Sequence, residues 1–175
     1  SIMSKKIALG ASNIVIDLKV GSGALIKNLD DATKLANIMI NIGKKYKRKV
    51  VCLLTNMDIP LGYNVGNSLE IKEAISVLKN EGEENLTNLC VALASHMVSL
   101  ALKISFDEAR EKVINTLKSG DALAKFYEFI NFQQGRIDEM KDALYKYDVK
   151  APINGFLTNI DAYIVGCYAC EIGCG

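Results

Sequence analysis

Hydrophobic residues gather in two short runs and in several stripes at helical spacing. The first run opens at Ile14–Ile16, continues in alternating fashion to Val20, and breaks at the glycine-rich loop Gly21–Gly23. A second run covers Lys49–Thr55, and the stripe between the runs begins at Asp30. Strands that are apolar on both faces are typical of parallel sheets covered by helices. The order strand, helix, strand therefore predicts a βαβ unit in an α/β fold.

The chain beyond the second run is predominantly helical in pattern. Asn67 and Glu70 stand in the N-x-x-E relation of a capping box, and Ser105 and Glu108 repeat it as S-x-x-E. Asp121 is expected to cap a further helix by its carboxylate. These signals predict three helix starts.

The longest apolar region is Leu89–Leu102. It is too short to span a bilayer and contains His96, so it predicts a buried helix at the centre of a core. His96 is the only histidine, and no partner stands at a suggestive spacing. We therefore interpret His96 as structural.

Composition narrows the class of protein. With 175 residues, half of them hydrophobic, the chain has the size of about one domain. A net charge of +1 without a long basic stripe disfavours nucleic acid as a partner. The N-terminus lacks the pattern of a secretion signal, and the five cysteines are not spaced as a disulfide framework. We expect a cytoplasmic protein with no membrane segment.

The C-terminal part predicts a change of organisation. Pro152 and Asn154-Gly155 indicate a soft domain boundary, after which Phe156–Gly175 predicts a short strand and the start of an apolar helix. The cysteines of C-x2-C-x3-C in this helix lack a fourth zinc ligand within the usual spacing. A chain that stops on an unfinished apolar element is expected to be a fragment of a longer protein.

Three features of the sequence pattern could belong to a binding or catalytic site. Gly21–Gly23 is either a simple turn or a ligand loop at the carboxyl end of a strand. Lys5, on a short N-terminal helix, is either an ordinary exposed lysine or a substrate contact. Glu73 lies opposite the main apolar face of its helix, between Leu69 and Val77, and is either solvated or paired.

Four stretches in order resemble the pyrimidine-nucleoside phosphorylases, which include the thymidine phosphorylases. They are SIMSKKIA, IVIDLKVGSGALIK, IPLGYNVGNSLEIKEA and LASHMVSLA, and the similarity continues through GFLTNIDAYIVG. The resemblance implies an α/β sheet of parallel βαβ units flanked by helices. Residues 1–12 would end a helical pyrimidine-binding domain, 13–150 would form the α/β phosphate-binding domain, and 151–175 would start a C-terminal β-containing region.

The family catalyses reversible phosphorolysis of pyrimidine nucleosides such as uridine and thymidine to the free base and a pentose 1-phosphate. By resemblance, Ser1 and Lys5 of the family motif S-x-x-x-K contact the pyrimidine, and Lys5 stabilises the charge that leaves with the base. Leu25 falls where the family places an apolar residue that lines the pocket.

The resemblance also implies a monovalent cation site of the Gram-positive members. Backbone carbonyls of Leu61 and Asn64 and the carboxylate of Glu73 would hold potassium, and no organic cofactor is expected. The whole enzyme would be a homodimer.

The sequence departs from the family pattern in two respects, and two alternative functions are considered. Asn56 and Ile59 replace an acidic residue and a glutamine that the family usually carries. The family's phosphate-binding segment would lie upstream of Ser1. A thymidine-selective phosphorylase is one alternative, and a non-catalytic α/β binding module is the other.

Overall fold

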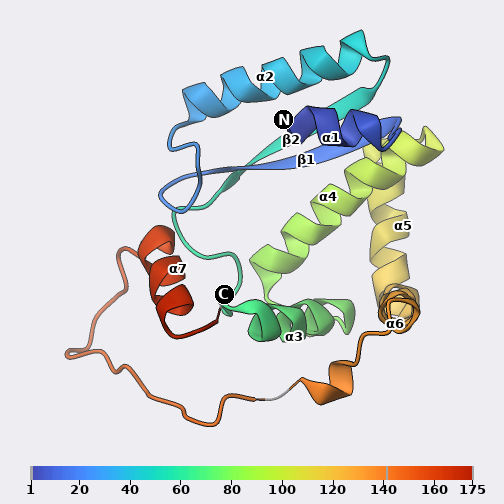
Figure 1. Cartoon of the computed structure of the whole chain (residues 1–175). Coiled ribbons are helices and arrows are strands. Elements are labelled where there is room, and N and C mark those ends of the chain that lie inside the picture. The colour runs from blue at the N-terminus through green and yellow to red at the C-terminus, as the bar shows by residue number, and fades with distance from the viewer. Residues whose placement is uncertain (1, 141, 175) are drawn as a thin grey trace.

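The computed structural model describes residues 2–140 and 142–174 (Figure 1). The elements in chain order are α1 (Ile2–Ala8), β1 (Asn13–Val20), α2 (Leu29–Lys45), β2 (Lys49–Asn56), α3 (Asn67–Leu78), α4 (Glu84–Leu102), α5 (Phe106–Ser119), α6 (Asp121–Phe132), the 3-10 helix η1 (Ile137–Glu139) and α7 (Ala162–Glu171).

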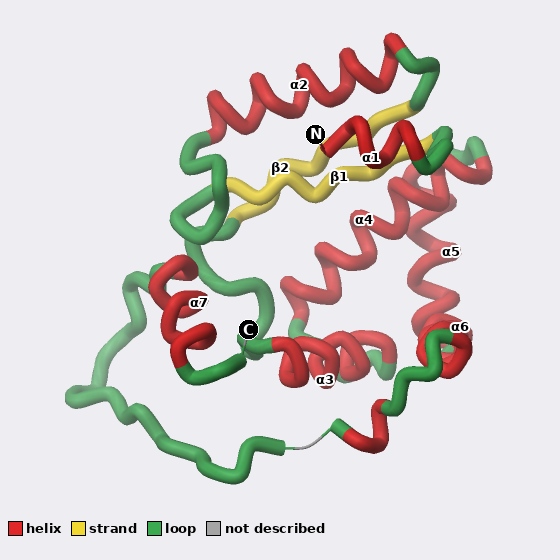
Figure 2. The backbone as a smooth tube through the Cα atoms, viewed as in Figure 1, coloured by secondary structure: helices red, strands yellow, loops and turns green. Residues whose placement is uncertain are grey.

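The two strands form a parallel sheet, as the pattern predicts. Figure 2 shows β1 and β2 side by side, with α2 as the crossover between them. The pairing runs from Asn13 opposite Lys49 to Val20 opposite Asn56. Both strands therefore end at the same edge, and the loops that leave them are neighbours.

One face of the sheet is covered by α2 and α1. Leu18 and Val20 pack against Ala32 and Ala36 of α2 in one buried cluster. A second cluster joins Met3 of α1, Ile14 of β1 and Met39 of α2. This face holds the core of the sheet.

Glycine lets α2 approach the sheet closely. A Cβ atom at Gly43 would lie 2.2 Å from Cγ2 of Val50, so only a hydrogen fits there. Gly43 lies in the last turns of α2, which runs on to Lys45.

The opposite face, which α4 covers, departs from the prediction of an apolar surface. Asp17 and Lys19 form an ion pair at 2.8 Å, and their side chains are 23% and 25% exposed. The Thr55 hydroxyl donates a hydrogen bond to Asp17. This face therefore carries a partly buried polar cluster near the carboxyl ends of the strands.

The helix α4 is longer and less enclosed than expected. It begins at Glu84, and among its described residues only Val91 and Ser95 are buried. One side packs against α5 and β1 (Figure 1), whereas the other lines a groove. By length and composition α4 would also suffice to cross a membrane, a test that core helices of soluble proteins pass as well. The prediction of a buried helix at the centre of a core was therefore wrong, because α3, α5 and α6 leave one side of α4 open to the groove.

One of the three predicted helix caps is confirmed. Ser105 Oγ accepts from Glu108 N, and Ser105 N–H donates to the Glu108 carboxylate, which completes a capping box on α5. The caps at Asn67 and Asp121 were wrong, because α3 and α6 begin at these residues and Gly66 and Gly120 occupy the cap positions. The Asp121 carboxylate instead accepts from the Ser119 hydroxyl at 2.7 Å.

The C-terminal segment contains the predicted helix but not the predicted strand. Residues 156–160 form no strand, whereas α7 covers Ala162–Glu171. Asp161 caps α7 by accepting from the N–H groups of Tyr163 and Ile164. The strand prediction failed because no neighbouring strand lies beside this segment in the described chain. The domain boundaries stay predictions.

Candidate functional site at the carboxyl edge of the sheet

The glycine-rich loop interlocks with the loop that follows β2. Gly23 N–H donates to the Met57 carbonyl at 2.9 Å, and Met57 N–H donates to the Val20 carbonyl at 2.7 Å. Gly21 has a φ of +135°, and a Cβ there would lie 2.6 Å from Asp58 N. Glycine is required at this position by both the backbone angle and the close approach.

Asp58 makes the largest number of these links. Its Oδ1 accepts from Ser22 N–H at 2.9 Å, and its backbone carbonyl accepts from the Ser22 hydroxyl at 3.1 Å. Asp58 N–H donates to Oδ1 of Asn56 at 2.8 Å, which turns the chain as it leaves β2. The two loops thus form one hydrogen-bonded unit.

The helix α7 packs onto this unit from the C-terminal segment (Figure 1). Ala162 N–H donates to the Asp58 carbonyl at 3.0 Å, and a Cβ at Gly23 would lie 2.8 Å from Cβ of Ala162. Lys27 donates to the Ser22 carbonyl at 2.6 Å while its ammonium lies 5.7 Å from the ring centre of Tyr163. A segment more than a hundred residues away thereby completes the site.

The loop presents one apolar side chain to solvent. Leu25 is 99% exposed, although its neighbour Ala24 is buried. Gly21 N–H donates to the Ile26 carbonyl at 3.1 Å, which closes the loop behind Leu25. The loop therefore fixes the backbone of Leu25 while the side chain packs against nothing.

Of the two predicted pyrimidine contacts, Lys5 lies on α1. Lys5 is exposed in the middle of this helix, and Ser1 lies outside the described residues. The strand β1 runs in the opposite direction to α1, so the first turn of α1 faces the end of the sheet that carries the glycine loop (Figure 1).

Glu73 is buried and paired, which resolves the two alternatives left by the sequence. It is 8% exposed. Its Oε1 accepts from Tyr63 N–H at 2.8 Å and its Oε2 from Asn64 N–H at 3.3 Å. Gly62 turns over the carboxylate with a φ of +75°, and a Cβ there would lie 2.4 Å from Oε2. The loop 61–64 is thus wrapped around one carboxylate.

The carboxylate of Glu73 keeps lone pairs that its two backbone partners do not use. A carboxylate has about four lone-pair directions, and the two backbone N–H groups occupy one on each oxygen. Leu61 and Asn64 belong to the loop 61–64, whose backbone N–H groups bind this carboxylate. Among residues 2–140 and 142–174 no three His, Cys, Asp or Glu side chains converge as a metal cluster.

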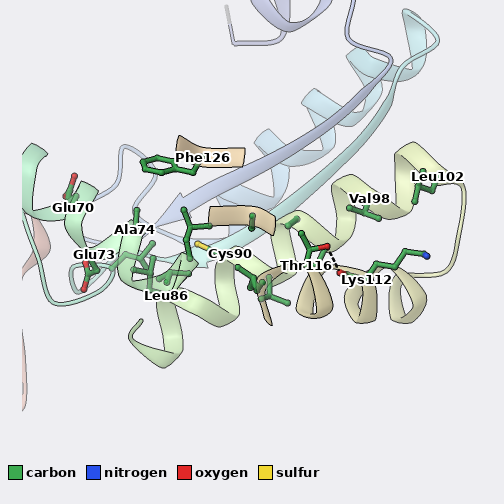
Figure 3. Close-up of a pocket in the computed structure, with 18 residues that line it drawn as sticks. Glu70, Glu73, Ala74, Leu86, Cys90, Val98, Leu102, Lys112, Thr116 and Phe126 are labelled. Atoms are coloured by element: carbon green, nitrogen blue, oxygen red, sulfur yellow. Dashed lines mark hydrogen bonds between the residues drawn. The ribbon is translucent and has the colours of Figure 1, made fainter. Parts of the chain in front are cut away.

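The same region opens into an apolar groove between α3, α4, α5 and α6 (Figure 3). Its volume is about 900 Å³, with Glu70 and Glu73 at the α3 end and Lys112 on α5. Cys90 lies on the α4 wall, where burial raises the pKa of its thiol. Lys19 favours the thiolate and Asp17 opposes it, both more weakly than burial.

His96 and Cys174 make packing and backbone contacts within the fold. The ring of His96 lies 4.6 Å from that of Phe106, at an angle of 43°. Cys174 packs against Gly66, and its carbonyl accepts from Asn67 N–H at 3.1 Å. All five cysteines are free thiols.

Sequence reasoning missed Asp58 and α7 as parts of the site. An Asn-x-Asp turn after an apolar strand is a local signal that could have drawn attention to Asp58. The contribution of α7 left no such signal, because it depends on contacts between distant segments.

Comparison with known proteins agrees with this architecture. Residues 1–123 match the family described as glycosyl transferase family, a/b domain. The whole chain is 44% identical over 182 aligned positions to a pyrimidine-nucleoside phosphorylase of Geobacillus stearothermophilus and 43% identical to that of Bacillus subtilis. The chain spans 42% of the length of these relatives.

Proposed function

Since the chain belongs to the glycosyl transferase family with an a/b domain, we propose that it forms part of a pyrimidine-nucleoside phosphorylase acting on uridine and thymidine. The observation that carries the proposal is the alignment of the whole chain with phosphorylases of that name. The glycine loop at the carboxyl edge of a parallel sheet supports it, because α/β folds bind ligands at this edge.

The reaction transfers a pentosyl group to phosphate. A phosphate oxygen attacks C1′ of the sugar as the bond from C1′ to N1 of the base breaks. The electron pair of that bond passes into the pyrimidine ring, and negative charge builds up on the ring carbonyls. The products are the free base and ribose or deoxyribose 1-phosphate.

Lys5 would stabilise the leaving base. Its ammonium, held on α1, would donate to the pyrimidine edge, and Ser1, four residues earlier in the sequence, would add a hydroxyl. Such a contact strengthens as the ring becomes anionic, so it stabilises the transition state more than the substrate. Leu25 would contribute the apolar wall of the same pocket.

We further propose that Glu73, with the carbonyls of Leu61 and Asn64, holds a monovalent cation such as potassium. The cation would neutralise a carboxylate that is otherwise buried with two backbone N–H partners. Its contribution is the positioning of the loop 61–64, and no bond is made or broken there.

Phosphate-dependent release of uracil from uridine and of thymine from thymidine tests the proposal in the full-length enzyme. Lys5→Ala should lower kcat/KM by about a hundredfold, because one preorganised donor to a developing anion is lost. Lys6→Ala is the matched control, since Lys6 is the adjacent exposed lysine of α1, and should stay within about twofold of wild type.

Three other outcomes change the assignment. Release of thymine alone would make the enzyme thymidine-selective. A wild-type enzyme that releases neither base would favour the binding module. Equal losses in Lys5→Ala and Lys6→Ala would remove the role assigned to Lys5.

A further inference from the structure

The glycine loop is anchored by Asp58, which belongs to the loop after β2. Asp58 receives the N–H of Ser22 on its carboxylate and the hydroxyl of Ser22 on its carbonyl, at 2.9 and 3.1 Å. The same carbonyl receives Ala162 N–H of α7 at 3.0 Å. One residue therefore joins the glycine loop, the loop after β2 and α7.

The contacts on Ser22 leave the loop little freedom. The carboxylate of Asp58 makes a charge-assisted hydrogen bond, which is about twice as strong as a neutral one. Gly23 lies against Met57 and Ala162, and Gly21 against Asp58 itself. Removing the carboxylate would leave the Ser22 N–H without the acceptor that links it to the loop after β2.

What the loop holds in place is Leu25. Its side chain is 99% exposed and gains nothing from packing within the chain. The backbone around it is fixed by Ala24 N–H donating to the Gly21 carbonyl at 3.0 Å and by the link between Gly21 and Ile26. The position of Leu25 thus depends on how firmly Gly21–Gly23 is anchored.

We propose that Asp58 is a positioning residue for the nucleoside pocket, which acts through Ser22 and the glycine loop to hold Leu25 against the pyrimidine. Asp58 itself does not touch the substrate. The inference rests on the proposed function, because it assigns a role in the recognition of the nucleoside. It predicts an effect on KM for the nucleoside and none on phosphate.

The test uses the full-length enzyme with Asp58→Ala, Asp58→Asn and Leu25→Ala. Loss of a hydrogen bond to a charged group should raise KM for uridine about tenfold in Asp58→Ala. KM for phosphate should stay within about twofold of wild type, as expected of a residue outside the phosphate site. Asp58→Asn keeps an oxygen that can accept from Ser22 N–H, so it should restore most of the affinity.

A double-mutant cycle with Leu25→Ala separates a positioning role of Asp58 from a purely structural one, because it measures whether the two effects on KM for uridine are additive. If Asp58 acts through Leu25, Asp58→Ala should add little to KM once Leu25 is truncated. Asp30→Ala, an exposed aspartate in the first turn of α2, is the control and should leave every constant unchanged.

Gly23→Ala replaces Asp58→Ala in this test if Asp58→Ala does not fold. The added methyl would lie 2.8 Å from Cβ of Ala162, so it displaces the loop from α7 while Asp58 stays intact. It should raise KM for uridine in the same way.

The inference is overturned if an active wild type shows no change of KM for uridine in Asp58→Ala or, where that variant is unfolded, in Gly23→Ala. Equal increases of KM for uridine and phosphate, or additive effects of Asp58→Ala and Leu25→Ala, would also overturn it. A wild type inactive on both nucleosides overturns the proposed function, and the inference with it.

Discussion

Glu70 and Glu73 lie three residues apart on α3, yet only Glu73 is buried. The difference comes from the loop 61–64, which folds over one carboxylate and gives it two backbone N–H partners. A buried carboxylate without partners would cost several kcal/mol, so the loop and the residue depend on each other.

Glu73→Ala should therefore lower the free energy of unfolding by about 1–3 kcal/mol, because it leaves two backbone donors without their acceptor. Glu73→Gln keeps one oxygen and should cost less. Chemical denaturation of both variants, with Glu70→Gln as the exposed control, measures the loss.

The same variants test the cation proposal. Potassium chloride should raise the melting temperature of wild type above its value in tetramethylammonium chloride at equal ionic strength, since a bound ion stabilises the folded state. Glu73→Gln should abolish the difference and Glu70→Gln should keep it. An equal potassium effect in Glu73→Gln would contradict the cation site.

Among the elements, α5 is the helix whose start is most completely specified by local sequence. Ser105 and Glu108 satisfy each other's backbone N–H groups, so the capping box needs no distant residue. The starts of α3 and α6 lack a side-chain cap and depend on the chain around them.

Ser105→Ala should destabilise the protein by about 1 kcal/mol, the usual cost of losing a serine cap. Asp107→Asn is the control, because Asp107 lies in the same turn without a capping bond. Urea denaturation compares the two, and an equal loss in both would mean that charge at the helix start matters more than the cap.

The capping box also predicts a pH dependence. The hydroxyl and N–H of Ser105, both bonded to the Glu108 carboxylate, hold the pKa of Glu108 below its usual range. A lowered pKa in the folded state means that the contribution is present above the ordinary glutamate pKa of about 4.3 and is lost as pH falls through the lowered value. Glu108→Gln should flatten this part of the stability profile, whereas a profile identical to wild type would contradict it.

At the scale of the whole molecule, a packed α/β part and α7 are joined by an exposed connection. The described residues from 142 to 159 are all exposed and form no helix or strand. Lys72 and Asp142 form an ion pair near its start. The helix α7 is thus attached mainly through its contacts at the carboxyl edge of the sheet.

Limited trypsin digestion should cleave this chain first at Lys146 and Lys150, because exposed irregular backbone fits a protease active site and helical backbone does not. Lys34 and Lys125, exposed on α2 and α6, are the internal controls. Mass spectrometry of the first products reads the result, and initial cleavage at Lys34 or Lys125 would contradict it.

Much of the α/β unit was predictable, because strands and helices follow local periodicity. Both strands, the crossover helix and the turn at the glycine loop came from the apolar pattern alone. Glu73 also stood out locally, as a carboxylate between apolar neighbours. The roles of Lys5, Leu25, Leu61 and Asn64 came from resemblance, and stay predictions.

The sequence by itself determined the two strands of the sheet, the crossover helix and where the glycine loop leaves β1, since these depend on neighbours a few residues away. Tertiary structure decided the rest. Gly66 holds the cap position of α3 while the Asn67 N–H donates to the carbonyl of Cys174, and Asp58 anchors Ser22 across 36 residues. Such bonds join segments that are distant in the chain, so only the packed fold brings their donors and acceptors together.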